Sequence, residues 1–203
     1  MLAQRIKGVL FDMDGVIVRQ SLDFMAIKRE IFGSTEGFIL ERMAGLDGAA
    51  RARAEALLEG HETEAAHKAE PVDGVVEFFQ WLAGRGIRRG IVTRNSPKSV
   101  AIVQEKLGIT VDAVVTRDDA TPKPSPEPVL VACRRLGIAP AEGLFVGDYE
   151  FDMLAGRRAG ITTVLFKNPV QPRSDNADLV VESFRDLQAW LSRDEHHTEE
   201  HAR

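Results

Sequence analysis

The chain has 203 residues, of which 44% are hydrophobic and 28% charged, and it carries a formal net charge of −5 at pH 7. This length is enough for one domain with a substantial core, alone or with a small inserted domain. The negative charge argues against nucleic acid or an anionic membrane surface as a partner, because both favour clustered Lys and Arg.

Cysteine content and hydropathy indicate the cellular setting. Cys133 is the only cysteine, so no intrachain disulfide can form. The sequence has no apolar run long enough to span a membrane, and its first residues lack the apolar core and cleavage site of a signal peptide. We therefore expect a cytoplasmic protein.

Short apolar runs alternate with helical segments along most of the chain. Strands are predicted at 7–12, 87–93, 112–116, 143–148, 162–166 and 178–181. They lack polar alternation, which is typical of parallel strands that are covered on both faces. Helices are predicted at 74–86, 97–108, 126–137, 149–160 and 184–193. This order predicts an α/β fold, a Rossmann-like parallel sheet with helices on both faces.

Four of the predicted helices end in the same way. Gly followed by Ile stands at Gly86, Gly108, Gly137 and Gly160. Because Gly readily takes the left-handed conformation that ends a helix, each pair predicts a helix end that leads to the next strand.

Residues 17–70 interrupt the alternation. They contain no convincing strand and predict three helices, at 22–32, 36–46 and 49–69. A parallel crossover rarely needs so much chain. We therefore expect a helical domain over 17–70, inserted after the first strand into a core domain formed by 1–16 and 71–193. Residues 194–203 lack apolar periodicity and predict a disordered tail.

Acidic side chains follow two of the predicted strands. The first strand ends at Asp12 and Asp14, the fourth ends at Asp148 and Asp152, and Lys123 follows the third. Taken singly, these residues have structural explanations, as helix caps, as charges at a helix N-terminus or as a surface lysine. Ligands bind beyond the carboxyl ends of open parallel sheets, however, where all five would converge. Four carboxylates beside one lysine are costly without further cations.

The second strand supplies hydrogen-bond donors. It ends at Thr93, Arg94 and Asn95, and their hydroxyl and backbone N–H groups, together with Lys123, are the donors that a phosphate needs. Arg94 can also supply a second cation. Hard carboxylate oxygens select Mg²⁺, which commonly shares a substrate phosphate. The sequence thus predicts a Mg²⁺ site and a phosphate site at one edge of the sheet.

Four motifs in this order resemble those of the haloacid dehalogenase (HAD) superfamily. They are "DMDGV" (12–16), "VTRNS" (92–96), "KPSPEP" (123–128) and "GDYEFD" (147–152). The helical insert after the first motif resembles a C1-type cap, as in the phosphoglycolate phosphatase-like branch. The resemblance implies a Mg²⁺-dependent phosphatase that hydrolyses a small phosphorylated metabolite through an aspartyl-phosphate intermediate.

The resemblance also implies a role for each acidic residue. Asp12 would be the nucleophile, and Asp14 would protonate the leaving oxygen and later activate water. Asp12, the Asp14 carbonyl and Asp148 would bind Mg²⁺, and Asp152 would order the metal's waters or Lys123 from a second layer. In this superfamily the carbon–halogen-cleaving enzymes lack the second Asp, and phosphonate-cleaving relatives replace it with a small residue. Asp14 therefore favours a phosphate ester.

By the same resemblance, the phosphoryl group would be bound by Thr93, Arg94, Asn95 and Lys123. Tyr149 departs from the pattern, because many relatives have Ser or another small residue there. It would either narrow the mouth of the site or pack on the next helix. In the insert, Arg19 and Arg42 are candidates for contacting the rest of the substrate.

Other functions stay open. A phosphomutase would keep the same core and differ in the insert. A phospho-accepting signalling module also gathers acids, a Thr and a Lys, but such modules are shorter and lack a helical insert. The five histidines lie in the insert and the tail, which argues against a histidine phosphatase or a Ser-His hydrolase. Exposed Phe or Met on the insert would suit a dimer face, so the sequence allows a monomer or a homodimer.

Overall fold

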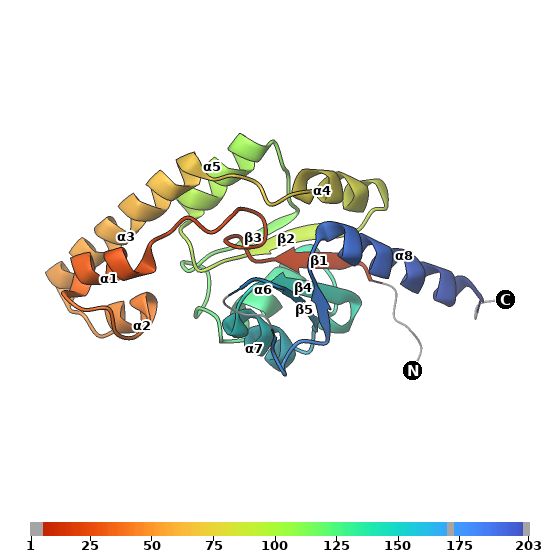
Figure 1. Ribbon diagram of the computed structural model, residues 1–203. Coiled ribbons are helices and arrows are strands. Elements are labelled where there is room, and N and C mark those ends of the chain that lie inside the picture. The colour runs from red at the N-terminus through yellow and green to blue at the C-terminus, as the bar shows by residue number, and fades with distance from the viewer. Residues whose placement is uncertain (1–5, 170–172, 201–203) are drawn as a thin grey trace.

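A six-stranded parallel sheet forms the centre of the structure, a computed structural model that describes residues 6–169 and 173–200. The strand order is β3-β2-β1-β4-β5-β6, and every neighbouring pair is parallel (Figure 1). The strands are β1 (Gly8–Phe11), β2 (Arg88–Val92), β3 (Ala113–Val115), β4 (Gly143–Gly147), β5 (Thr162–Phe166) and β6 (Leu179–Val181). Each lies inside its predicted range, so the predicted α/β fold is confirmed.

Helices cover both faces of this sheet (Figure 1). One face packs against α4 (Val75–Gly84), α5 (Pro97–Leu107) and α8 (Phe184–Glu200), and the other against α6 (Glu127–Leu136) and α7 (Glu150–Ala159). A short 3₁₀ helix, η1 (Pro140–Glu142), precedes β4. Along β1, Val9 and Phe11 join the first core and Leu10 the second, because successive strand residues point to opposite faces.

The predicted glycine helix ends are present. Gly108, Gly137 and Gly160 follow the last residues of α5, α6 and α7 with φ of +61°, +64° and +75°. Gly86 comes two residues after the end of α4, with φ of +68°. The positive φ of each glycine turns the chain away from the helix.

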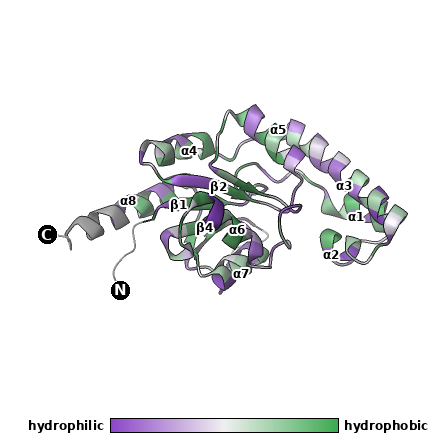
Figure 2. Cartoon of the chain, turned by 180° about the vertical axis from the view of Figure 1, so that it is seen from behind, coloured by the Kyte–Doolittle hydropathy of each residue, from purple (hydrophilic) through white to green (hydrophobic). Residues whose placement is uncertain are grey.

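Residues 17–70, called the insert below, form three helices beside the sheet (Figure 1). They are α1 (Phe24–Phe32), α2 (Ile39–Met43) and α3 (Gly48–Lys68). Figure 2 shows alternating hydrophilic and hydrophobic bands along α3. The three helices are held together by a small core formed by Ile27, Ile39, Met43, Ala54 and Leu58. Helix α2 is shorter than the predicted 36–46. At its start, Gly37 has φ of +67°, which keeps residues 36–38 out of the helix.

The two segments that join the insert to the sheet domain run side by side. The backbone N–H of Arg19 donates to the Glu70 carbonyl oxygen at 2.8 Å, and that of Val72 to the Ile17 carbonyl oxygen at 3.0 Å. The far end of α3 packs against α5, where Ala66 joins the main core. The insert is thus anchored both at its ends and along α3.

The end of the chain differs from the sequence prediction. Helix α8 continues to Glu200, where a disordered tail is predicted from residue 194 onward, and residues 201–203 lie outside the described residues. Among the described residues, no helix combines the length and the hydropathy that crossing a membrane requires.

Candidate active site

Asp12 and Lys123 meet at the carboxyl end of the sheet. Asp12 directly follows β1, and Lys123 lies in the loop between β3 and α6. Lys123 Nζ lies 2.8 Å from Asp12 Oδ1 and 2.6 Å from Asp152 Oδ1, and it donates to the Val92 carbonyl oxygen at 3.1 Å. Only 2% of the Lys123 side chain is exposed. Lys123 is therefore a buried ammonium between two carboxylates, which excludes a surface lysine.

Asp148 joins this pair of carboxylates. Carboxylate oxygens of Asp12, Asp148 and Asp152 lie within 4.8 Å of one another. Burial raises the pKa of Asp12 to about 7 and that of Asp148 to about 8; neighbouring carboxylates add to both shifts and Lys123 opposes them. Burial alone would lower the pKa of Lys123, but Asp12 and Asp152 hold it above its usual value. When its carboxylates are ionised, the cluster carries more negative charge than one ammonium offsets.

Two glycines make room for these carboxylates. Gly15 has φ of +78°, and a Cβ at this position would lie 1.9 Å from Asp148 Oδ2. A Cβ at Gly147 would lie 2.2 Å from the Asp152 Cβ. Because both distances are far below van der Waals contact, a larger residue at either position would displace a carboxylate.

The ends of β1 and β2 bring together Asp14, Thr93 and Asn95. The Asn95 side-chain amide donates to Asp14 Oδ2, and its backbone N–H donates to Thr93 Oγ1 at 3.1 Å. Thr93 and Asn95 are buried. Burial raises the pKa of Asp14, and the hydrogen bond from Asn95 opposes this shift. Thr93 and Asn95, which are predicted to bind phosphate, therefore lie beside Asp14, and burial of Asp14 favours its protonated form.

The acidic cluster has the chemistry of a site for a hard divalent cation. Such ions prefer oxygen ligands, and a nearby cation relieves the repulsion between buried carboxylates. Among the described residues, Lys123 is the one ammonium in ion-pair contact with this cluster of three carboxylates. In Asp152, Oδ1 contacts Lys123 and Oδ2 accepts a hydrogen bond from the Tyr149 N–H at 3.1 Å. Because both oxygens of Asp152 already have partners, Asp152 suits the second layer around the metal, as the resemblance implies.

Residues 6–160 match the family model of the haloacid dehalogenase-like hydrolases. The chain belongs to this family.

Curated relatives of this hydrolase include phosphatases. The N-acetylmuramic acid 6-phosphate phosphatase of Pseudomonas aeruginosa is 30% identical over 95% of this chain and 98% of its own length. The phosphoglycolate phosphatase of Xanthomonas campestris is 32% identical over 78% of this chain and 81% of its own. A solved hydrolase from Pseudomonas syringae has a TM-score of 0.75 at 21% identity, covering 92% of this chain and 98% of its own, and so shares the fold.

Asn168 is a site residue of this hydrolase that the sequence analysis missed. Its side-chain amide donates to Asp148 Oδ2 at 3.0 Å and to the Asp148 carbonyl oxygen at 2.9 Å. It lies two residues after the end of β5, which pairs with β4. The signal in the sequence was its place just after the fifth predicted strand, because the other site residues also follow strand ends.

The insert reaches the loop after β2 through a buried carboxylate. Glu62 of α3 accepts hydrogen bonds from Arg117 Nη1, at 2.5 and 2.6 Å from its two oxygens, and from the Ser96 N–H at 3.2 Å. Burial raises the pKa of Glu62, and the contacts with Arg117 oppose this. No motif or periodicity in the sequence indicates this contact between the insert and the sheet domain.

A second contact between the insert and the sheet domain involves Arg94. Its Nη2 donates to both carboxylate oxygens of Glu41 on α2, at 2.9 and 2.7 Å, so its side chain is paired with the insert. Next to it, the ring centroids of Phe38 and Phe151 lie 4.7 Å apart, and those of Phe151 and Tyr149 lie 5.4 Å apart. Tyr149 therefore belongs to an aromatic group at the contact with the insert.

The two arginines predicted for substrate contact have partners elsewhere. Arg19 Nη2 lies 2.8 Å from Asp73 Oδ1, where the insert joins the sheet domain. Arg42 Nη1 donates to Ser34 Oγ at 2.9 Å and to the Glu36 carbonyl oxygen at 3.0 Å, and its guanidinium carbon lies 3.9 Å from the Phe32 ring centroid. The contacts of Arg42 thus stabilise the insert itself, and its role towards substrate stays a prediction.

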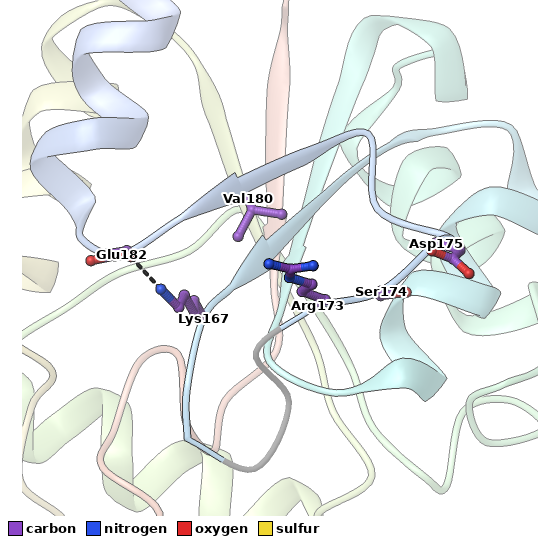
Figure 3. A pocket seen from close by; sticks show the side chains of 6 residues that line it. All are labelled: Lys167, Arg173, Ser174, Asp175, Val180 and Glu182. Atoms are coloured by element: carbon purple, nitrogen blue, oxygen red, sulfur yellow. Dashed lines mark hydrogen bonds and ion pairs between the residues drawn. The ribbon is translucent and has the colours of Figure 1, made fainter.

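A separate surface pocket of about 610 Å³ lies at β5 and β6 (Figure 3). It is lined by Lys167, Arg173, Ser174, Asp175, Val180 and Glu182. Lys167 Nζ and Glu182 Oε1 form an ion pair at 2.5 Å across it. None of these six residues belongs to the acidic cluster, so the pocket is distinct from the candidate active site.

Proposed function

We propose that the protein is a Mg²⁺-dependent phosphatase that hydrolyses a small phosphorylated metabolite through an aspartyl-phosphate intermediate on Asp12. The observation that carries this proposal is the buried Lys123 ammonium, 2.8 Å from Asp12 at the carboxyl end of the sheet. Positioning and charge neutralisation dominate phosphoryl transfer, and this arrangement supplies both. The relatives named as phosphatases support the proposal.

The nucleophile is an oxygen of Asp12. Its Oδ1 accepts a hydrogen bond from the Met13 N–H at 2.7 Å and contacts Lys123 at 2.8 Å. These contacts fix the carboxylate, so we assign the attack on phosphorus to Oδ2. A bond forms between Oδ2 and phosphorus while the bond to the ester oxygen breaks.

Asp14 moves the protons. Its raised pKa favours the protonated form, which gives its proton to the leaving oxygen of the substrate. The resulting carboxylate then takes a proton from the water that attacks the phosphorus of the aspartyl-phosphate. This second step releases inorganic phosphate and restores Asp12. Asn95 orients Asp14 for both transfers through its hydrogen bond.

Donors from two loops bind the phosphoryl oxygens. They are the Thr93 hydroxyl, the backbone N–H groups of Arg94 and Asn95, and the Lys123 ammonium. The Asn95 N–H donates to Thr93 Oγ1 in the structure and would exchange that partner for a phosphoryl oxygen. Mg²⁺ would be held by Asp12, Asp148 and the Asp14 carbonyl, with Asp152 outside them. When bound, the ion supplies positive charge beside the phosphoryl oxygens.

The insert completes the site in this proposal. We assign residues 17–70 as a cap domain, residues 1–16 and 71–193 as the catalytic core, and substrate choice to the cap side chains. The substrate is a small phosphorylated molecule. A cytoplasmic location, which the single cysteine favours, belongs to the same proposal.

Phosphate release from an aryl phosphate in the presence of Mg²⁺ tests the proposal. Asp12→Asn should lower the rate by about a thousandfold or more without loss of folding, because the nucleophile is removed. Asp47→Asn is the matched control: Asp47 is exposed, and its side chain makes no cap hydrogen bond to α3. Chelation of the metal should also stop release, and added Mg²⁺ should restore it. Release by Asp12→Asn near the wild-type rate would exclude Asp12 as the nucleophile, and a wild-type protein that isomerises phosphate esters without releasing phosphate would be a mutase.

A further inference from the structure

Arg94 joins three parts of the molecule at the candidate active site. Its Nη1 donates to the Lys123 carbonyl oxygen at 2.5 Å, and its guanidinium carbon lies 5.2 Å from the Phe151 ring centroid. Its Nη2 contacts both carboxylate oxygens of Glu41 in the insert. Because Arg94 directly follows Thr93, its backbone N–H is one of the donors assigned to the phosphoryl group, while its guanidinium is held at the contact with the insert.

Glu41 is the carboxylate partner of Arg94 at the contact between the insert and the sheet domain. The single nitrogen Nη2 of Arg94 contacts both oxygens of Glu41, and charge-assisted hydrogen bonds of this kind are how arginine recognises carboxylate and phosphate groups. The Arg94 side chain is 23% exposed and that of Glu41 is 46% exposed, so solvent reaches the pair. The Glu41 carboxylate thus pairs with Arg94. Without Glu41, Arg94 could bind a second negative group on a substrate.

The surroundings of this pair are aromatic. Phe38 contributes a ring from the insert, and Phe151 and Tyr149 contribute rings from the start of α7. Aromatic rings of this kind suit the uncharged part of a ligand. The Glu41 carboxylate, in contrast, repels an anion. The charge of Glu41 and the aromatic group therefore favour the same kind of substrate.

We propose that Glu41 is a specificity-determining residue. By neutralising Arg94, it directs the enzyme towards phosphate monoesters whose leaving group is uncharged and away from those that carry a second anionic group. This inference rests on the proposed phosphatase function. Glu41 touches no reacting atom in this account and acts through Arg94.

Two substrates with the same carbon skeleton test the proposal. Glycerol 3-phosphate has a neutral hydroxymethyl group where 3-phosphoglycerate has a carboxylate. The wild-type enzyme should prefer glycerol 3-phosphate in kcat/KM. Glu41→Gln should raise the ratio of kcat/KM for 3-phosphoglycerate to that for glycerol 3-phosphate by about tenfold or more, because Arg94 becomes available to the carboxylate.

Glu36→Gln is the matched control. It removes the same charge from an exposed position in the loop before α2, and it should leave the ratio unchanged. A ratio within twofold of wild type in Glu41→Gln would overturn the proposal. An equal loss of activity on both substrates would also overturn it, because Glu41 would then only tether α2 to the sheet domain.

A binding measurement separates this inference from the proposed function. In an Asp12→Asn background, calorimetry should show that Glu41→Gln tightens binding of 3-phosphoglycerate relative to glycerol 3-phosphate. If the wild-type protein hydrolyses neither ester, the calorimetric ratio still decides whether Glu41 screens Arg94. Release of phosphate from the aryl phosphate separately decides the phosphatase proposal. An unchanged calorimetric ratio would reject the role of Glu41.

Discussion

Replacing Lys123 with Met should destabilise the protein strongly, and more so at high pH. The Met side chain keeps most of the volume, so the main change is the loss of an ammonium that lies 2.8 Å from Asp12 and 2.6 Å from Asp152. Removing one partner of a buried ion pair costs about 3–5 kcal/mol. We expect a decrease of that size in the free energy of unfolding at about pH 8.5, measured without metal, where the carboxylates are charged.

The pH dependence follows from Asp12. Its pKa in the folded protein is raised from 3.8 to about 7. The folded state therefore keeps a proton that the unfolded state releases, and stability falls as pH rises between these two values. Lys123 lowers the pKa of Asp12, so removing Lys123 raises that pKa further. Stability then continues to fall with rising pH beyond pH 7. At about pH 5.5, where Asp12 is already neutral, the loss should be smaller by about 1 kcal/mol or more.

Urea denaturation of both proteins in the presence of a chelator, at the two pH values, measures this difference. Lys167→Met is the matched control, because Lys167 pairs with Glu182 at the surface, where the side chains are 43% and 70% exposed. The control should change stability by less than about 0.5 kcal/mol at either pH. A loss for Lys123→Met no larger than that of the control, or one that does not grow with pH, would refute the reasoning.

Two further predictions concern metal binding and the turn after β1. Because burial raises the pKa of Asp148 to about 8, Mg²⁺ must displace a proton to bind at lower pH, and its affinity should increase with pH. The rise in Tm on adding Mg²⁺ should therefore be larger at about pH 8.5 than at about pH 6, and an equal rise would count against the acidic cluster as the metal site. Gly15→Ala should abolish phosphate release and destabilise the fold by about 1–3 kcal/mol, because its Cβ would overlap Asp148. Gly33→Ala has a similar φ of +69° with no atom within 4 Å of the added Cβ, so it should retain activity; loss of activity in both variants would point to backbone strain alone.

The strands and the central site were predictable because they depend on local sequence. Apolar runs set the six strands, and parallel pairing then places Asp12, Lys123 and Asp148 at one edge. The chemistry of that edge follows from which residue types stand at the strand ends, since all six strands point the same way. The sequence alone was therefore sufficient to place these three residues at one edge of the sheet.

The contacts between the insert and the sheet domain were not predictable in this way. Glu41 and Arg94 are 53 positions apart, and Glu62 and Arg117 are 55 apart. Whether they meet depends on the angle at which the insert packs on the sheet domain, and no periodicity encodes that angle. For the same reason Arg42, selected only as a basic residue of the insert, instead bonds within it.

The adjacent ends of residues 17–70 have a consequence for how this enzyme can change. Because Arg19 bonds to Glu70 and Val72 bonds to Ile17, the chain leaves and rejoins the sheet domain at nearly one point. A loop whose ends already touch can lengthen, shorten or be exchanged at a small entropic cost and without altering strand pairing. Selection can therefore remodel the helices of the insert while the sheet and the acidic cluster at its edge stay the same.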